Sequence, residues 1–181
     1  MVKQTPWSER RFNFDFPVGL LPCILTRLRG TPARVEEIAR RLPDSILTRR
    51  IGNAWSIQEH IGHLLDLEEL HEKRIEDYES GAASLRPADL KNQKTEEARY
   101  NSKSFESILT SFRSARLHFV RRFEEMDEAF LSRSALHPRL QQQMRVVDLA
   151  FFVAEHDDHH VARMVSLSST LLNQSLEPAP V

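Results

Sequence analysis

Apolar residues recur at three- and four-residue steps over most of this chain, and this spacing restricts the fold more than any other feature. An α-helix turns once in about 3.6 residues, so residues at such steps share one face that must be buried. Alternating β-branched residues are scarce, and only 5 glycines are present. The pattern predicts a fold built from long amphipathic helices.

The first part of the chain is less regular. We expect an extended arm at residues 1–16 and a short helix or turns at residues 17–29, where prolines interrupt the apolar run. A clearer helix is expected from Thr31, which is a good N-cap and is followed by a proline suited to the first helical position. This helix would end near Leu42, because Pro43 cannot continue it.

Three longer helices are expected farther along. Ser56 and Glu59 have the spacing of a capping box, which satisfies free backbone donors at a helix start, and this helix would reach about Tyr78. The next two would cover about residues 102–127 and 146–172. Long polar connections separate these segments. We therefore expect a single domain over residues 1–181 with an all-α, four-helix-bundle fold.

Composition excludes several functions. The formal net charge is −1, which gives no general attraction to nucleic acid or to anionic membranes. No segment is apolar over the roughly 18–20 residues that a membrane-spanning helix requires. Nothing at the N-terminus resembles a signal peptide, and the single cysteine, Cys23, excludes an internal disulfide. These features favour a cytoplasmic protein without a nucleic-acid or membrane partner.

The last predicted helix contains the segment VAEHDDHHVARM. His156 and His160 are four residues apart, so both project from one helix face and can reach one metal ion. This spacing alone is a weak signal, and a polar surface with Asp157, Asp158 and His159 in water is the alternative. However, the two histidines interrupt an apolar face, while Asp157 and Asp158 are expected to point outward. Buried imidazoles need polar partners, which a metal or buried carbonyls and carboxylates would supply.

A third ligand would come from the helix that begins near Ser56. His60 and His63 lie at the border of its apolar stripe, so either could point into the bundle. Glu59 and Asp66 lie about one turn from His63, and either could orient an imidazole, although a solvated charged face is the alternative. The remaining histidines on helices are expected at the surface: His71, His118 and His159.

The order W-S-x-x-E-H-x-x-H-L-x-D, followed about 90 residues later by A-E-H-D-x-H-H-x-A-R, resembles the DinB-like superfamily. This superfamily of bacterial four-helix bundles groups YfiT-type metal-dependent hydrolases with bacillithiol- or mycothiol-dependent transferases. The resemblance extends over nearly the whole chain, including the segments RPADLKNQKT and HPRLQQQMR. It implies up-down-down-up topology, a homodimer and a metal held by His63, His156 and His160. It also makes His137 a candidate at the edge of the site, with a simple loop histidine as the alternative.

Three neutral imidazoles would leave a divalent ion its full charge and an open position. Zinc in such a setting lowers the pKa of bound water to about 7, which supports hydrolysis, and the same position could deprotonate a thiol cofactor. Nickel, manganese or iron could also bind, because imidazole selects weakly among these metals. We therefore expect a metal-dependent enzyme acting on a small molecule, either a low-molecular-weight-thiol S-transferase or a hydrolase. The alternative is a non-catalytic, metal-stabilised or ligand-binding stress-response bundle.

The arm at residues 1–16 is rich in aromatic residues. Phe12, Phe14 and Phe16 could help to form the homodimer that the resemblance implies, or they could cover one end of the bundle. Trp7 and Trp55 are expected to act as packing anchors rather than as ligand platforms.

Overall fold

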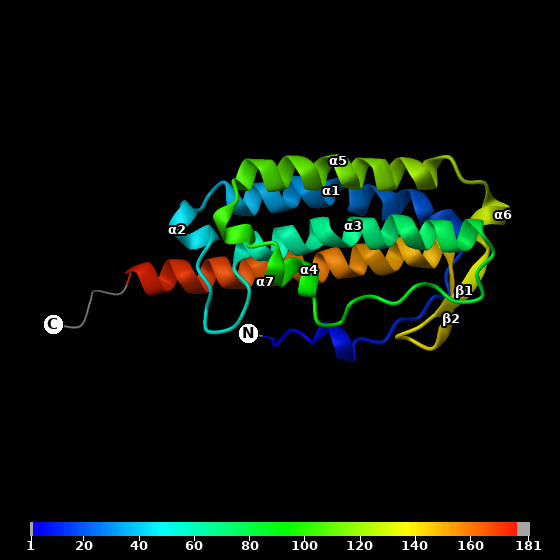
Figure 1. Ribbon diagram of the computed structural model, residues 1–181, viewed down its shortest axis with the longest axis horizontal. Coiled ribbons are helices and arrows are strands. Elements are labelled where there is room, and N and C mark those ends of the chain that lie inside the picture. Colours follow the sequence, from blue (N-terminus) through cyan, green and yellow to red (C-terminus); the bar gives the residue numbers. More distant parts are fainter. Residues whose placement is uncertain (1, 177–181) are drawn as a thin grey trace.

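The computed structural model describes residues 2–176 and consists mainly of four long helices that lie side by side (Figure 1). These are α1 (Leu21–Ala39), α3 (Ile57–Glu79), α5 (Phe105–Glu124) and α7 (Val146–Leu176). The shorter elements are η1 (Trp7–Glu9), η2 (Val18–Leu20), α2 (Asp44–Leu47), α4 (Gln93–Glu97), η3 (Tyr100–Ser102), α6 (Glu128–Leu131), β1 (Ser134–His137) and β2 (Gln142–Arg145). The predicted all-α four-helix bundle is confirmed. No helix among the described residues is both long and apolar enough to cross a membrane.

Contacts between neighbouring helices define their directions. Along the contacts between α1 and α5, residue numbers rise in one helix as they fall in the other, so these helices are antiparallel. Residue numbers rise together along α3 and α5, which are parallel, and in opposite directions along α3 and α7, which are antiparallel. The contacts are Arg29–Glu124 and Arg40–Glu106, then Glu68–Arg116 and Glu79–Arg122, then His60–His160 and His63–His156. The helices therefore run up, down, down and up, as expected. The long connection between α3 and α5 follows from this order, because these parallel helices begin at the same end of the bundle (Figure 1).

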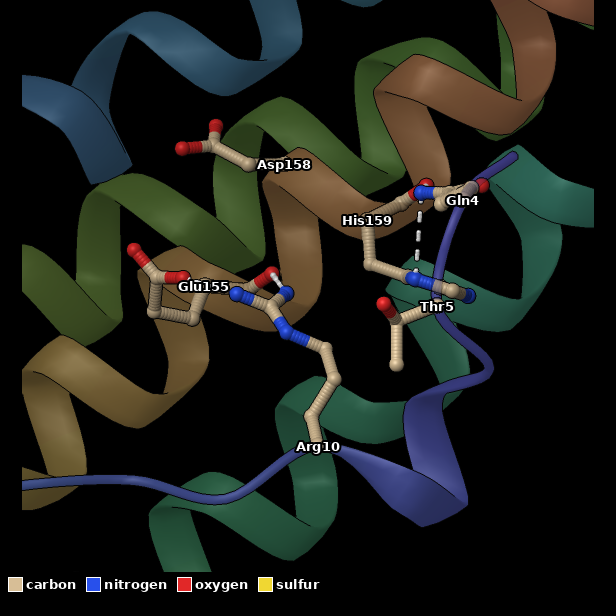
Figure 2. Close-up of a pocket in the computed structure, with 6 residues that line it drawn as sticks. All are labelled: Gln4, Thr5, Arg10, Glu155, Asp158 and His159. Atoms are coloured by element: carbon tan, nitrogen blue, oxygen red, sulfur yellow. Dashed lines mark hydrogen bonds and ion pairs between the residues drawn. The ribbon is translucent and has the colours of Figure 1, made fainter. Parts of the chain in front are cut away.

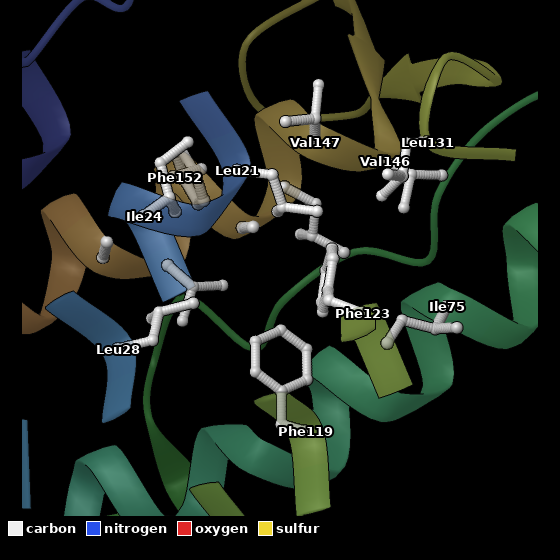
Figure 3. Packing of buried hydrophobic residues seen from close by; sticks show 14 of the residues in the cluster. Leu21, Ile24, Leu28, Ile75, Phe119, Phe123, Leu131, Val146, Val147 and Phe152 are labelled. Atoms are coloured by element: carbon white, nitrogen blue, oxygen red, sulfur yellow. The ribbon is translucent and has the colours of Figure 1, made fainter. Parts of the chain in front are cut away.

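The apolar stripes of the helices meet in two separate clusters. One lies around Leu28, Phe119 and Val153, and Figure 3 shows how side chains from α1, α3, α5 and α7 converge there. The other lies around Ile61 and Phe112 toward the opposite end of the helices. Fully burying a large apolar side chain contributes about 1.5–3 kcal/mol, so these clusters stabilise the bundle. Between them lies a layer of buried polar side chains, and this layer contains the candidate site.

The prediction that a helix begins at Thr31 is wrong. Helix α1 begins at Leu21 and continues through Pro32. A proline inside a helix leaves the carbonyl four residues earlier without its usual donor. That carbonyl belongs to Leu28, and Arg116 Nη1 lies 3.5 Å from it and donates to it. The Thr31 hydroxyl does not cap a helix start and instead donates to the buried carboxylate of Asp157 at 2.7 Å. Tertiary contacts therefore outweigh the local signal for a helix start.

The other helix predictions agree more closely with the structure. The capping box of Ser56 and Glu59 is present at the start of α3. The polar connection after α5, in contrast, contains a two-stranded antiparallel hairpin, β1–β2, which was not predicted. Arg145 at the end of this hairpin donates to the carbonyl oxygens of Phe14 and Phe16 at 2.8 and 2.9 Å. The hairpin therefore fixes the N-terminal arm along the bundle.

The three phenylalanines of the arm pack on α7. Phe12 contacts Phe152 with 5.0 Å between ring centroids, and Phe16 contacts Phe151 at 5.2 Å. This arrangement agrees with the alternative in which the arm covers the bundle. A role of the arm in a homodimer stays a prediction.

Candidate metal centre

Three histidines from two helices meet in the polar layer. His63 projects from α3, and His156 and His160 project from adjacent turns of α7. One ring nitrogen of each lies within 4.8 Å of one ring nitrogen of the other two. All three side chains are buried, with exposed fractions of 5–7%. The structure thus brings together the three histidines that the family resemblance implied.

The orientation of His63 is set by a chain of hydrogen bonds. Its Nδ1 lies 3.2 Å from the Thr95 hydroxyl, which lies 2.9 Å from Asp66 Oδ2. The hydroxyl has a single proton, and the carboxylate can only accept, so the Thr95 hydroxyl donates to Asp66 and accepts from His63 Nδ1–H. A neutral His63 then has its lone pair on Nε2. This is the tautomer that a metal ligand requires, and a carboxylate behind a ligating histidine is a common way to fix it.

Asp66 is itself held in place by Tyr100. The phenol hydroxyl donates to Asp66 Oδ1 at 2.6 Å. The Tyr100 ring packs directly on α3 at Gly62, where an added Cβ would overlap the ring atoms. Gly62 therefore permits the close approach that positions Asp66. Asp66 was one of two carboxylates predicted to orient an imidazole, and it contacts His63 only through Thr95.

The two histidines of α7 face each other. His160 Nε2 lies 3.1 Å from His156 Nε2, and His160 Nδ1 lies 2.8 Å from Nδ1 of His60. His156 Nδ1 is buried and has no hydrogen-bond partner among the described residues. His60 thus contacts His160 rather than completing the three-histidine group. A cation among the three rings would give their facing lone pairs a common partner, so the donor set fits a metal ion.

Burial keeps these imidazoles neutral. It lowers the pKa of His63 to about 4 and, with a smaller contribution from His63, the pKa of His60 to about 3. The pKa values of His156 and His160 lie well below the usual value, mainly because of burial and also because of the neighbouring histidines. Neutral imidazole is the form that binds metals. The site is therefore ready to bind a cation at neutral pH without first losing protons.

Two tryptophans border the site. The Trp7 ring lies 4.8 Å from the His156 ring in an edge-on arrangement, and the Trp55 ring lies 4.7 Å from His63. Trp55 also stacks over His160 at 6.3 Å. Both were expected to be packing anchors, and they pack on the histidines themselves.

A cavity of about 350 Å³ opens beside His63, between α3 and the connection that follows it. Apolar and charged side chains both contribute to its walls, so it can accept a small amphipathic molecule. Its lining includes His63, Asp66, Leu67, Leu70, Lys73, Pro87 and Thr95.

A second pocket, of about 310 Å³, lies where the N-terminal arm crosses α7. Figure 2 shows Gln4, Thr5 and Arg10 of the arm facing Glu155 and His159 of the helix. Arg10 pairs with Glu155, and Gln4 donates to the His159 carbonyl at 3.0 Å. These contacts fasten the arm over α7, where Trp7 of the arm packs against His156.

Asp157 does not point outward as predicted. Its side chain is 1% exposed and forms an ion pair with Arg116 of α5, whose side chain is also 1% exposed. Thr31 donates to the same carboxylate at 2.7 Å, and Glu68 lies 2.5 Å from the other side of Arg116. Asp158 is half-buried and pairs with two arginines of α1. The acids of the motif therefore join α7 to α1, α3 and α5.

Other predicted positions also differ from the structure. His71 was expected at the surface but is 4% exposed, and His159 is half-buried beneath the arm. His118 is exposed, as expected. Glu59 does not orient an imidazole, because its carboxylate is bound by Arg50 at 2.6 Å and by the backbone N–H of Ser56.

His137 is buried in the hairpin, and its ring centroid lies 5.1 Å from that of Phe152. Phe152 lies on α7 one turn before His156. His137 is therefore near the site but does not contact the three histidines.

Comparisons with known proteins support the fold. The chain resembles YfiT from Bacillus subtilis, a probable metal-dependent hydrolase with an unusual four-helix bundle topology, with a TM-score of 0.77 and 17% identity over 90% of this chain and 94% of that one. It also resembles a mycothiol-dependent maleylpyruvate isomerase, with a TM-score of 0.64 and 10% identity over 82% of this chain and 63% of that one. Identities this low show the fold alone.

No curated protein matches the chain. The sequence pattern of the DinB superfamily, however, matches residues 27–164, which is more than half of the chain. The chain therefore belongs to the DinB superfamily.

Proposed function

We propose that this protein is a metal-dependent enzyme in which His63, His156 and His160 hold a divalent ion. The observation that carries the proposal is the grouping of three buried, neutral imidazoles within 4.8 Å of one another. Zinc, nickel, manganese and iron all suit such ligands. Held by neutral side chains, the ion would keep its full charge and would acidify a water molecule or a thiol at its open position.

The protein side chains fix the geometry of this centre. Asp66 and Thr95 hold the His63 ring with its Nε2 lone pair available, and His60 lies against His160 Nδ1. Trp7 and Trp55 pack against the rings and would limit access of water. Such positioning contributes to catalysis because reacting groups are aligned before the chemical step.

Thiol transfer is the reaction class that the surroundings of the centre favour. Both oxygens of Asp66 accept hydrogen bonds, and Glu59 is paired with Arg50, so neither carboxylate is free to act as a general base for water. The ion would acidify a bound water as well, but a thiol is far more acidic than water before it binds and therefore depends less on a separate base. The sulfur would form a bond to an electrophilic carbon, the leaving group would depart with its electron pair, and the thiol proton would pass to solvent.

The substrate and assembly are also part of the proposal. We propose a low-molecular-weight thiol and a small-molecule electrophile as the reactants, and a cytoplasmic homodimer as the working form. The cavity of about 350 Å³ beside His63 is of a suitable size for such a small molecule.

Turnover assays test the proposal. Protein loaded separately with zinc, nickel, manganese or iron would be assayed with a thiol and an aromatic halide, and in parallel with an ester. We expect metal-dependent thioether formation that is lost in His156→Ala and kept in His118→Ala, which changes an exposed histidine. Ester hydrolysis alone would replace transfer by hydrolysis as the reaction class. No metal-dependent turnover with either substrate would favour a non-catalytic bundle.

A further inference from the structure

One arginine of α3, Arg74, is buried and has no counterion among the described residues. Arg74 is 2% exposed, and no carboxylate of the described residues lies within ion-pair distance of it. Among the residues that the structure describes, the Arg74 side chain makes one hydrogen bond, from Nε to the Arg86 carbonyl at 3.2 Å. Asp77, which influences it electrostatically, is already bound by the Arg86 guanidinium at 2.7 Å. Burial lowers the pKa of Arg74 to about 10, so it remains charged at neutral pH.

Two further donors lie in the β1–β2 hairpin, which the segment at Arg86 joins through a hydrogen bond of 3.0 Å from the Leu85 N–H to the Leu136 carbonyl. The Nη2 group of Arg139 is buried and has no hydrogen-bond partner in residues 2–176, and the same is true of Nε2 of His137. The Leu140 N–H donates to His137 Nδ1 at 3.2 Å. Nδ1 is therefore the acceptor nitrogen, and a neutral His137 carries its proton on the unpaired Nε2.

These three side chains act on one another electrostatically. Arg74 and Arg139 both lower the pKa of His137, after burial, which is the largest cause, and Arg139 lowers that of Arg74. The cluster consists of donors and positive charge, without an acceptor of its own. An unpaired buried charge is costly, and unpaired buried donors add to that cost. A metal ion cannot satisfy such a group, whereas an anion can satisfy all of it.

The cluster adjoins the metal centre through shared aromatic side chains. The Arg139 guanidinium lies 5.4 Å from the Trp7 ring, and the Trp7 ring lies 4.8 Å from the His156 ring. Arg74 follows His63 by eleven residues, which is three helical turns, so both lie on one face of α3. An extended small molecule could therefore reach the cluster with one end and the three histidines with the other.

We propose that Arg74, Arg139 and His137 bind the anionic oxygen group, a carboxylate or a phosphate, of the small molecule on which this protein acts. The anion-binding part stands on the cluster alone, while its role in substrate binding rests on the proposed metal-dependent function. Arginine suits this task because its planar fork donates two hydrogen bonds to one anionic group.

Calorimetric titration of metal-free protein with succinate, and separately with inorganic phosphate, tests the proposal. We expect saturable binding of at least one of them, with affinity reduced tenfold or more in Arg74→Gln and in Arg139→Gln. Arg133→Gln is the matched control, because Arg133 directly precedes the hairpin, is exposed and stacks on Phe130. Binding of neither anion to the wild type would overturn the proposal, as would equal affinities in all variants.

Two further measurements separate this site from the metal centre and from a purely structural role. His63→Ala should retain anion binding; binding lost there but kept in Arg74→Gln would assign the anion to the metal centre instead. In buffer without multivalent anions, Arg74→Gln should unfold at the same temperature as the wild type or higher, because it removes an uncompensated buried charge. A large fall in the unfolding temperature would show that Arg74 serves the fold and would contradict the proposal.

Discussion

His63 Nδ1 and the Thr95 hydroxyl lie 3.2 Å apart, although Thr95 belongs to the connection that follows α3 and not to the bundle core. The contact fixes the histidine tautomer because Thr95 must donate to Asp66. Replacing Thr95 by valine keeps the shape and removes the hydroxyl. Since loss of such a partner typically weakens metal binding 10–100-fold, we expect Thr95→Val to do so in a competitive zinc titration.

Thr110→Val is the control for this change, because Thr110 is exposed on α5. It should bind zinc like the wild type. Equal zinc affinities of Thr95→Val and Thr110→Val would show that the hydroxyl does not position His63.

The close approach of Tyr100 to Gly62 predicts a destabilising effect of one methyl group. Gly62→Ala would force the Tyr100 ring away from α3, at a cost of about 1–3 kcal/mol. Gly30→Ala adds the same methyl group within α1, where nothing lies within 4 Å, and should stabilise by about 1 kcal/mol. Urea unfolding of both variants measures the difference, and a Gly62→Ala variant as stable as the wild type would refute this account of the contact.

The buried ion pairs of Arg116 predict a larger effect. Arg116→Met removes the cation between Glu68 and Asp157 and leaves two carboxylates without it, which should cost about 3–5 kcal/mol at neutral pH. Burial already raises the pKa of Glu68 to about 7, despite the opposing effect of Arg116. Arg121→Met, an exposed change on the same helix, should have little effect. Thermal unfolding of the two variants measures the difference in stability, and similar midpoint temperatures for both would contradict the prediction.

The lowered pKa values of the site histidines predict how stability depends on pH. In metal-free protein, an imidazole with a folded pKa of about 4 stays neutral between pH 6.5 and 4, while the unfolded chain takes up a proton. The unfolded state then binds more protons, so the free energy of unfolding falls as the pH falls, by about 1.4 kcal/mol per pH unit for each such histidine. His63→Gln should show a shallower decline than the wild type in urea titrations across this range. Identical slopes would argue against a buried, neutral His63.

Much of the site could be predicted from local patterns in the sequence. The four-residue spacing of His156 and His160 places them on one helix face, and their position in an apolar stripe predicts burial. The choice of His63 over His60 came from the family resemblance, because both lie at the border of the same stripe. In the structure His60 turns to His160, which periodicity could not resolve.

Other parts of the site depend on tertiary packing and leave little local trace. Thr95 reaches His63 only because the connection after α3 folds back on that helix. Arg116 falls at an apolar-stripe position between Phe112 and Phe119, and this was the one signal of its burial. Asp157 was wrongly predicted to point outward because its partner, Arg116, is on another helix and leaves no trace in the local sequence. The continuous path of α1 through Pro32 likewise depends on Arg116, which donates to the freed carbonyl.

The central claim is that His63, His156 and His160 hold one metal ion. Elemental analysis of protein purified without an affinity tag, with His63→Ala, His156→Ala and His118→Ala beside the wild type, tests it most directly. The account predicts close to one metal ion per chain in the wild type and in His118→Ala, and almost none in the other two variants. A wild type that remains metal-free after titration with divalent ions, or a metal content unchanged in His63→Ala and His156→Ala, would contradict it.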